Sequence, residues 1–236
     1  MMATNLNTLA IATDGDPRPL GRNNFHAPEA DVTVYFRDLE TELIRQIESA
    51  QAVIGCVAWL TSEPILSALA NVPNGVSIVV QKEDFLRPDV GASGLWRSTL
   101  RRLYGRVPSR LIRNNLPGLV GQLSYCGDFG MDAIRCVGNH NKHKTPAFPR
   151  MHNKFIALCN IDTNEYGDVS RLRPYAVWTG SFNFTKNAAM SLENAVVISN
   201  DWIAQAYYHE WEQILALSEP LDWESEWSAP EWRIGS

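Results

Sequence analysis

Apolar residues along this chain follow two alternating periods, which predicts an α/β fold. From Val32 onward they recur every three to four residues, as in an amphipathic helix, with Asp38 as the candidate N-cap. Two continuous apolar runs rich in β-branched residues, Ala52–Trp59 and Val76–Gln81, are typical of buried strands. Between them Thr61 or Ser62 precedes a second helical pattern. The helical positions nearest the N-terminus are Leu39, Leu43, Ile44 and Ile47. The order helix, strand, helix, strand is that of an α/β domain.

The second half of the chain predicts further strands and helices. Trp96, Leu100 and Leu103 share one face of a short helix. A final helix over Asp201–Leu217 is expected to turn Trp202, Ala206, Trp211 and Ile214 inward. A polar hairpin is expected over 162–173 and a short helix over 187–192. The remaining apolar runs predict strands over Leu119–Cys126, Asp132–Val137, His152–Leu158, Tyr175–Thr179 and Glu193–Ile198.

Polar residues suited to phosphate chemistry accompany two of these predicted strands. Side chains alternate along a strand, so His152 and Lys154 share one face. The strand Tyr175–Thr179 leads directly to Ser181 and Asn183, which are again two residues apart. A histidine can attack or protonate a phosphate group, while a lysine and an asparagine stabilise its negative charge. The pattern therefore predicts a phosphate-binding, potentially catalytic, centre.

The segments that carry these residues resemble the phospholipase D superfamily. They read MHNKFIAL, GSFNFT and LENAVVI, and they are most similar to members that have one His-x-Lys motif per chain, such as small bacterial endonucleases. The resemblance extends over roughly Val32–Leu217. It implies an α/β fold in which a mixed β-sheet is sandwiched by helices, with one half-site per chain.

The resemblance also implies a role for each residue. His152 is the nucleophile that forms a covalent phosphohistidine, while Lys154 and Asn183 hold the non-bridging oxygens with Ser181 close to them. Glu193 is expected to hydrogen-bond the imidazole and fix its tautomer. The reaction needs a nucleophile and a general acid, and this chain has one such motif. A two-fold homodimer that brings both copies of His152 together is therefore expected.

The chain departs from the superfamily pattern at Cys159, where that pattern, His-x-Lys-x4-Asp, has an aspartate. Cys159 is an odd number of residues from His152, so its side chain is expected on the opposite face of the strand. We therefore expect activity to survive. The alternative is a site that has lost catalysis and only binds.

Charge is distributed unevenly along the chain. The net charge is −5, but residues 82–154 carry +8 and the remainder carries −13. Local positive potential attracts polyanions even where the net charge is negative. Arg150 and three arginines of the short helix are candidate substrate contacts. The alternative for the helix is a solvated basic surface with no partner. The three helical arginines are Arg97, Arg101 and Arg102.

These features favour a metal-independent nuclease of low sequence specificity that cleaves DNA or RNA. One alternative is a phospholipase-type phosphodiesterase, although the sequence has no amphipathic interfacial helix. The other is a non-catalytic binding or effector subunit of a larger assembly, including an antiviral one. No membrane association is expected, and the simplest location is the cytoplasm because the chain shows neither a signal peptide nor a disulfide framework.

The expected organisation has three parts: a flexible arm over 1–31, a catalytic domain over 32–217 and an acidic tail over 218–236. Three tail tryptophans are expected to pack on the domain or to dock a partner: Trp223, Trp227 and Trp232. No cofactor or metal is expected. A zinc site stays an open alternative at one group of cysteines and histidines, although the spacing of these residues is not a common one for zinc. The group consists of Cys126, Cys136, His140 and His143.

Overall fold

The computed structural model describes residues 5–8, 10–11, 18–19, 24–83, 94–124, 130–138, 150–221 and 233–234. Within this part of the chain, one sheet of nine strands forms the centre of the molecule, in the order β12-β8-β6-β5-β9-β10-β11-β4-β3. Only the pairs β5–β6 and β6–β8 are parallel, so the sheet is mixed. Its strands are β3 (Phe25–Ala27), β4 (Val32–Tyr35), β5 (Ala52–Val57), β6 (Val76–Gln81), β8 (Ile134–Val137), β9 (Lys154–Thr163), β10 (Val169–Gly180), β11 (Ala195–Ile198) and β12 (Glu219–Pro220).

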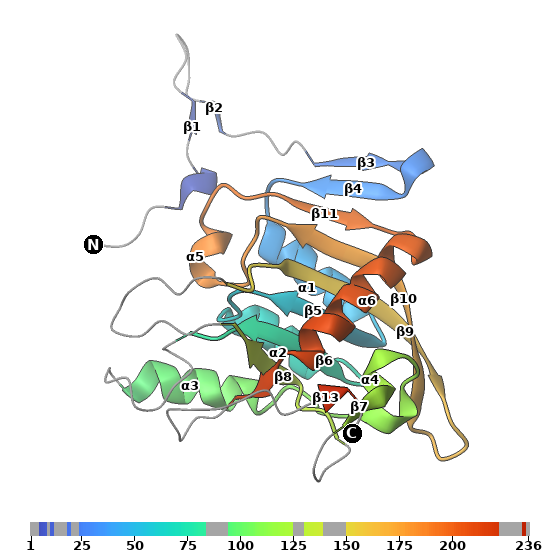
Figure 1. Ribbon diagram of the computed structural model, residues 1–236. Helices are drawn as coiled ribbons and strands as arrows, with labels where there is room; N and C mark the ends of the chain where they lie inside the picture. The colour runs from blue at the N-terminus through green and yellow to red at the C-terminus, as the bar shows by residue number, and fades with distance from the viewer. Residues whose placement is uncertain are drawn as a thin grey trace.

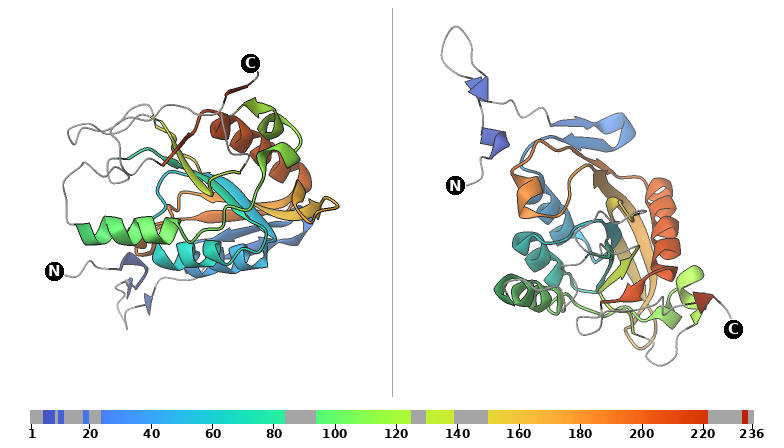
Figure 2. Two further views of the ribbon diagram at one scale, coloured as in Figure 1. Left: turned by 90° about the horizontal axis from the view of Figure 1, so that it is seen from below. Right: turned by 60° about the vertical axis from the view of Figure 1, so that its left-hand side comes forward.

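Helices cover both faces of this sheet (Figures 1 and 2). On one face lie α1 (Leu39–Ser49), α2 (Glu63–Ala70) and α3 (Gly94–Tyr104). On the other lie α6 (Asp201–Ala216) and α4 (Leu119–Gln122). The predicted α/β fold, a mixed sheet sandwiched by helices, is confirmed. The shorter elements are η1 (Leu6–Thr8), β1 (Ala10–Ile11), β2 (Arg18–Pro19), η2 (Pro28–Ala30), η4 (Arg113–Asn115), β7 (Leu123–Ser124), α5 (Lys186–Ala189) and β13 (Arg233–Ile234).

Side chains of the central strands alternate between two apolar clusters. In β9, Ile156 and Leu158 pack with α1, α2 and α3, whereas Phe155, Ala157 and Cys159 pack with α6. All five side chains are buried, so strand parity decides which helical layer each one meets. Alternation therefore also determines which side chains near the start of β9 lie on the face of α1 to α3.

Strand β5 approaches β9 closely at Gly55. A Cβ atom at this position would lie 2.3 Å from the carbonyl oxygen of Phe155, nearer than non-bonded atoms come. Glycine thus permits the close β5–β9 pairing, in which Val57 is opposite Lys154. This pairing places the segment that follows β5 beside the segment that precedes β9.

Several sequence predictions are confirmed with small shifts in their limits. Strands β5 and β6 and helices α1, α2 and α6 form where expected, and Ser62 caps α2 by accepting a hydrogen bond from the Ile65 N–H. The hairpin predicted over 162–173 joins β9 to β10. The helix predicted over 187–192 is α5, which begins and ends earlier.

Three predictions were wrong in part: those for the segment from Val32, for the segment from Leu119 and for the buried face of α6. Val32–Tyr35 is a strand that pairs with β11, not the start of a helix, because its β-branched residues find a partner far along the sequence. Leu119–Gln122 is a short helix, where the Glu212 carboxylate accepts a hydrogen bond from the Val120 N–H.

In α6, Trp202 and Ala206 are exposed rather than inward. They lie two residues from Ala204 and Tyr208, which puts them on the opposite side of a helix with 3.6 residues per turn. The side chains that α6 buries are Ala204, Tyr208, Trp211, Glu212, Ile214 and Leu215.

Both ends of the chain contact the domain in the described part. Strand β3 extends the sheet into the segment predicted as an arm, and the Asn7 side chain donates hydrogen bonds to the carbonyl oxygens of Ala189 and Ser191. Strand β12 pairs with β8, and β13 pairs with β7. The three tail tryptophans lie outside the described residues, and the three-part division stays a prediction. Among the described helices, none is long and apolar enough to cross a membrane.

Candidate active site

Four strand ends meet at one end of the sheet, on the side where α5 lies in Figure 1. Strand register brings them together: Val57 is opposite Lys154, Phe155 is opposite Thr179, and Gly180 is opposite Ala195. The residues just beyond these positions are His152, Ser181 and Glu193, so the fold gathers the three predicted segments at one edge.

His152 lies just before β9 rather than within it, because the strand begins at Lys154. The connection is still held in place: the Ala58 N–H donates to the carbonyl oxygen of Asn153 at 2.8 Å, and the Met151 N–H donates to Oε1 of Gln81 at 2.7 Å. The two predicted residues come together. Nζ of Lys154 lies 3.2 Å from Nδ1 of His152 and donates to the His152 carbonyl oxygen at 3.1 Å.

Trp59 and Arg150 complete the surroundings of the imidazole. The Trp59 ring meets the His152 ring edge to face, with 5.3 Å between the centroids. The Arg150 guanidinium carbon lies 6.0 Å from the centre of the same indole, within cation–π range. Sequence analysis identified Arg150 as a substrate contact but missed Trp59. Its signal in the sequence was its position at the end of the buried run, two residues before Thr61.

Two effects lower the pKa of His152 below its usual 6.5. Partial burial disfavours the charged imidazole, and the positive charges of Lys154 and then Arg150 add to this. The pKa of Lys154 is also lowered by burial, while the Glu193 carboxylate opposes that shift. A neutral imidazole beside an ammonium group is the protonation pattern that a nitrogen nucleophile requires.

Glu193 and Ser181 contact each other. The Ser181 hydroxyl donates a short hydrogen bond to Oε2 of Glu193 and accepts one from the Asn194 N–H at 3.1 Å. Gly180 permits this close approach of β10 and β11, since a Cβ there would lie 2.4 Å from the carbonyl oxygen of Asn194. The predicted hydrogen bond from the imidazole to the Glu193 carboxylate is not formed within one chain. Glu193 accepts from Ser181 instead, and His152 lies beside Lys154.

Asn183 lies two residues beyond Ser181 and is half-buried. Its side-chain oxygen is buried and has no hydrogen-bond partner in the described part of the chain. Buried polar groups left without a partner are uncommon, and a catalytic role or a bound water or ion is one explanation for them. Its backbone is well fixed, because the carbonyl oxygen of Asn183 accepts from the Thr185 N–H at 2.8 Å. Asn183 is thus positioned with one polar group unused.

The three arginines of α3 are placed differently from Arg150. Arg101 and Arg102 are exposed and Arg97 is half-buried. Arg101 lines a cavity of about 410 Å³ with Asp132 and Pro220. The role of these three arginines in substrate binding stays a prediction.

Metal-ligating side chains do not cluster in the described residues, where no group of three or more His, Cys, Asp or Glu is suitably placed. Three members of the proposed zinc group, Cys126, His140 and His143, lie outside those residues. The fourth, Cys136, is buried beside Glu219, and burial followed by the Glu219 charge raises the pKa of its thiol to about 12. Cys136 is thus part of the buried core.

Comparison with known proteins was made by sequence and by structure. No protein-family model matches the chain. It is 32% identical over 213 residues to the uncharacterized protein L381 of Acanthamoeba polyphaga mimivirus, and the match covers 86% of this chain and 72% of L381.

Among solved structures, NucT from Helicobacter pylori matches with a TM-score of 0.50 and 14% identity, covering 80% of this chain and 98% of NucT. Nuc from Salmonella typhimurium, a phospholipase D family member, matches with a TM-score of 0.47 and 21% identity, covering 82% and 98% of the two chains. At these identities the likeness concerns the fold. The chain belongs to the same family as mimivirus L381, and its fold is similar to that of NucT.

Proposed function

We propose that this protein is a metal-independent phosphodiesterase, and specifically a nuclease of low sequence specificity that acts as a homodimer on DNA or RNA. One observation carries the proposal: the ammonium of Lys154 lies 3.2 Å from the His152 ring at the strand edge where Ser181, Asn183 and Glu193 converge. A nucleophile paired with a fixed cation suits attack on a phosphodiester, whose oxygens gain charge in the transition state.

The chemistry proceeds in two displacements. In the first, an imidazole nitrogen of His152 forms a bond to phosphorus as the bond to the leaving oxygen breaks. That oxygen takes a proton from a general acid, and Lys154 stabilises the charge on the non-bridging oxygens. In the second, water attacks phosphorus, the phosphorus–nitrogen bond breaks, and the general acid recovers a proton from the water. Atoms and charge balance without a redox partner.

The general acid is supplied by His152 of the partner subunit in this proposal. The two other histidines of the described residues are engaged elsewhere. His26 contacts Thr33 in the strand pair β3–β4, and His209 on α6 contacts Glu212. A two-fold axis at the strand edge would bring two copies of His152 to one phosphate. The unused oxygen of Asn183 is consistent with a site that a second molecule completes.

The position of Cys159 favours a site that is still catalytic over a site that has lost catalysis and only binds. Its thiol is buried in the α6 layer with Ala157, and burial raises its pKa well above the usual value. Lys154 lies at even spacing from Ile156 on the other face of β9. The change from aspartate therefore falls behind the sheet and removes no group that contacts the phosphate.

Nucleic acid is favoured as the substrate by the residues beside His152. Arg150 offers a guanidinium for a neighbouring phosphate, and Trp59 offers an aromatic ring. Each flanking phosphate of a polymer can engage a cation of this kind, which gives affinity without base readout.

Replacing His152 with Ala is expected to lower nuclease activity at least about a thousandfold, because the reaction loses its nucleophile. Wild type is expected to remain active in excess EDTA. Cleavage of labelled single- and double-stranded DNA and RNA measures both effects. His26→Ala is the matched control, since His26 is an exposed histidine at the β3 edge. Activity that disappears in EDTA, or that survives in His152→Ala, would contradict the mechanism.

The acid limb of the kcat/KM profile is expected below pH 6.5, because attack needs a neutral imidazole whose pKa is lowered. Replacing Arg150 with Gln removes one of the positive charges that disfavour the protonated ring, so the limb is expected to move upward. Arg102→Gln, on the exposed side of α3, serves as control and leaves the limb in place. A limb that stays fixed in Arg150→Gln would show that Arg150 does not act on His152.

Mixing wild type with His152→Ala protein tests the shared site. If each active site needs His152 from both subunits, activity at constant total protein follows the square of the wild-type fraction after subunit exchange. Light scattering should give twice the chain mass of 26.5 kDa for the active species. A linear decline of activity, or an active monomer, would contradict the homodimer.

A further inference from the structure

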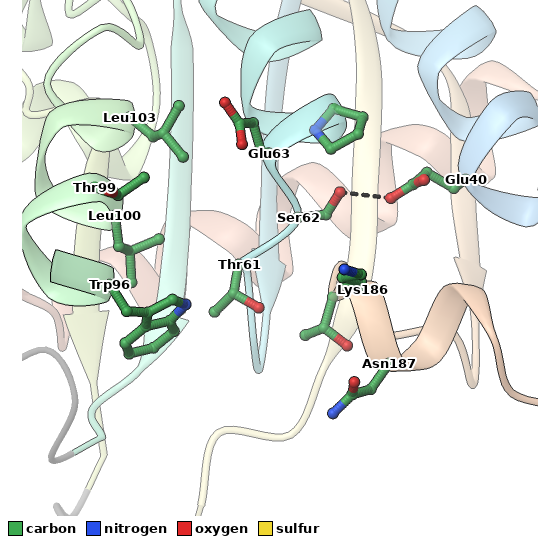
Figure 3. A pocket seen from close by; sticks show the side chains of 12 residues that line it. Glu40, Thr61, Ser62, Glu63, Trp96, Thr99, Leu100, Leu103, Lys186 and Asn187 are labelled. Carbon is green, nitrogen blue, oxygen red and sulfur yellow. Dashed lines mark hydrogen bonds between the residues drawn. The ribbon is translucent and has the colours of Figure 1, made fainter. Parts of the chain in front are cut away.

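A cavity of about 620 Å³ opens beside the candidate active site, between α3 and α5 (Figure 3). Figure 3 shows Trp96 and Leu100 of α3 on one side and Lys186 and Asn187 of α5 on the other, with Thr61 between them. A volume of this size falls within the range of small-molecule sites in proteins. It is larger than a nucleobase needs and is sufficient for a nucleoside.

The walls of this cavity continue from the two segments that carry the active-site residues. Thr61 follows Trp59 by two residues, and Thr185 follows Asn183 by two residues. The segments are hydrogen-bonded to each other, since the Thr61 and Ser62 N–H groups both donate to the carbonyl oxygen of Phe184, at 2.8 and 2.9 Å. Two extended residues span about 7 Å, and the turn at Asn183, whose carbonyl oxygen accepts from the Thr185 N–H, spans less. The cavity therefore begins roughly one nucleotide away from the catalytic residues.

The lining of the cavity favours a flat group with N–H donors over a phosphate. Trp96 is 48% exposed and Leu100 is buried beneath the same wall. Among the described residues that line the cavity are two carboxylates, Glu40 and Glu63, and one cation, Lys186. Glu40 is fixed by a hydrogen bond from the Ser62 hydroxyl at 2.5 Å. This excess of negative charge disfavours an anion, whereas carboxylates accept hydrogen bonds from the exocyclic amines of bases.

We propose that this cavity binds the base of a nucleotide next to the scissile phosphate, unstacked from its strand. Trp96 stacks on the base, and the carboxylate of Glu63 accepts a hydrogen bond from an exocyclic amine. The inference rests on the proposed nuclease function and adds two properties to it. The substrate is single-stranded at the site of cleavage, because a paired base cannot enter the cavity. Bases with an exocyclic amine are preferred over thymine.

Equilibrium binding of fluorescein-labelled oligonucleotides to the full-length His152→Ala protein tests the proposal. The ligands are oligodeoxycytidylate, oligodeoxythymidylate and an abasic phosphodiester chain of equal length. Trp96→Ala, added to this protein, is expected to weaken binding of both base-containing ligands about tenfold and to leave the abasic chain unchanged, because stacking needs a base. Glu63→Gln is expected to weaken oligodeoxycytidylate more than oligodeoxythymidylate. Leu95→Ala is the control, as Leu95 is 87% exposed and does not line the cavity.

Equal weakening of all three ligands by Trp96→Ala, or no weakening of any, would overturn the proposal. Thermal melts of the variants identify a loss of folding, and in that case Trp96→Phe, which keeps an aromatic ring, is expected to restore base-dependent binding. A separate activity assay tests the proposed nuclease function on which this inference rests. Wild type that does not hydrolyse bis(p-nitrophenyl) phosphate would contradict the phosphodiesterase proposal, while base-dependent binding through Trp96 would still stand.

Discussion

Antiparallel pairing among β5, β9, β10 and β11 determines where each candidate catalytic side chain lies. The close approach of β5 to β9 at Gly55 and of β10 to β11 at Gly180 fixes the register of these strands. With that register set, Lys154 and the residues just beyond β10 and β11 meet at one end of the sheet. A slip of one residue would turn Lys154 toward α6 and separate it from the other groups. The chemistry thus depends on backbone packing in the centre of the sheet.

Electrostatics at this edge follow from partial burial. Lys154 is only half-exposed, and its charge acts on an imidazole that is itself partly screened from water. Burial, and after it the Lys154 ammonium, lowers the pKa of His152, and the same ammonium is placed to meet the charge that develops on phosphate. Glu193 accepts a hydrogen bond from Ser181, and its negative charge acts on Lys154 by raising the pKa of the ammonium against the effect of burial. Lys154 and Trp59 are the residues that contact the imidazole and orient it.

The central strands and the helices over them could be predicted because their causes are local, whereas the grouping of His152, Lys154, Ser181 and Asn183 was expected from the superfamily resemblance of the segments that carry them. Continuous β-branched runs and helical spacing need no knowledge of distant partners. The incorrect predictions concern residues whose structure depends on a partner far away in the sequence. Val32–Tyr35 is a strand because β11 lies beside it, and Glu193 binds Ser181 because β10 and β11 approach so closely. The cavity beside α3 could not be predicted either, since its walls come from four helices separated in sequence.

Detection of a covalent phosphohistidine at His152 is the most direct test of the central proposal. The protein is mixed with a phosphodiester substrate, quenched in alkali because phosphohistidine is labile in acid, and digested for mass spectrometry. The proposal predicts a phosphoryl-linked adduct on the peptide that contains His152 during turnover, and none in His152→Ala. Turnover without an adduct, or an adduct on another residue, would contradict the assignment of His152 as the nucleophile.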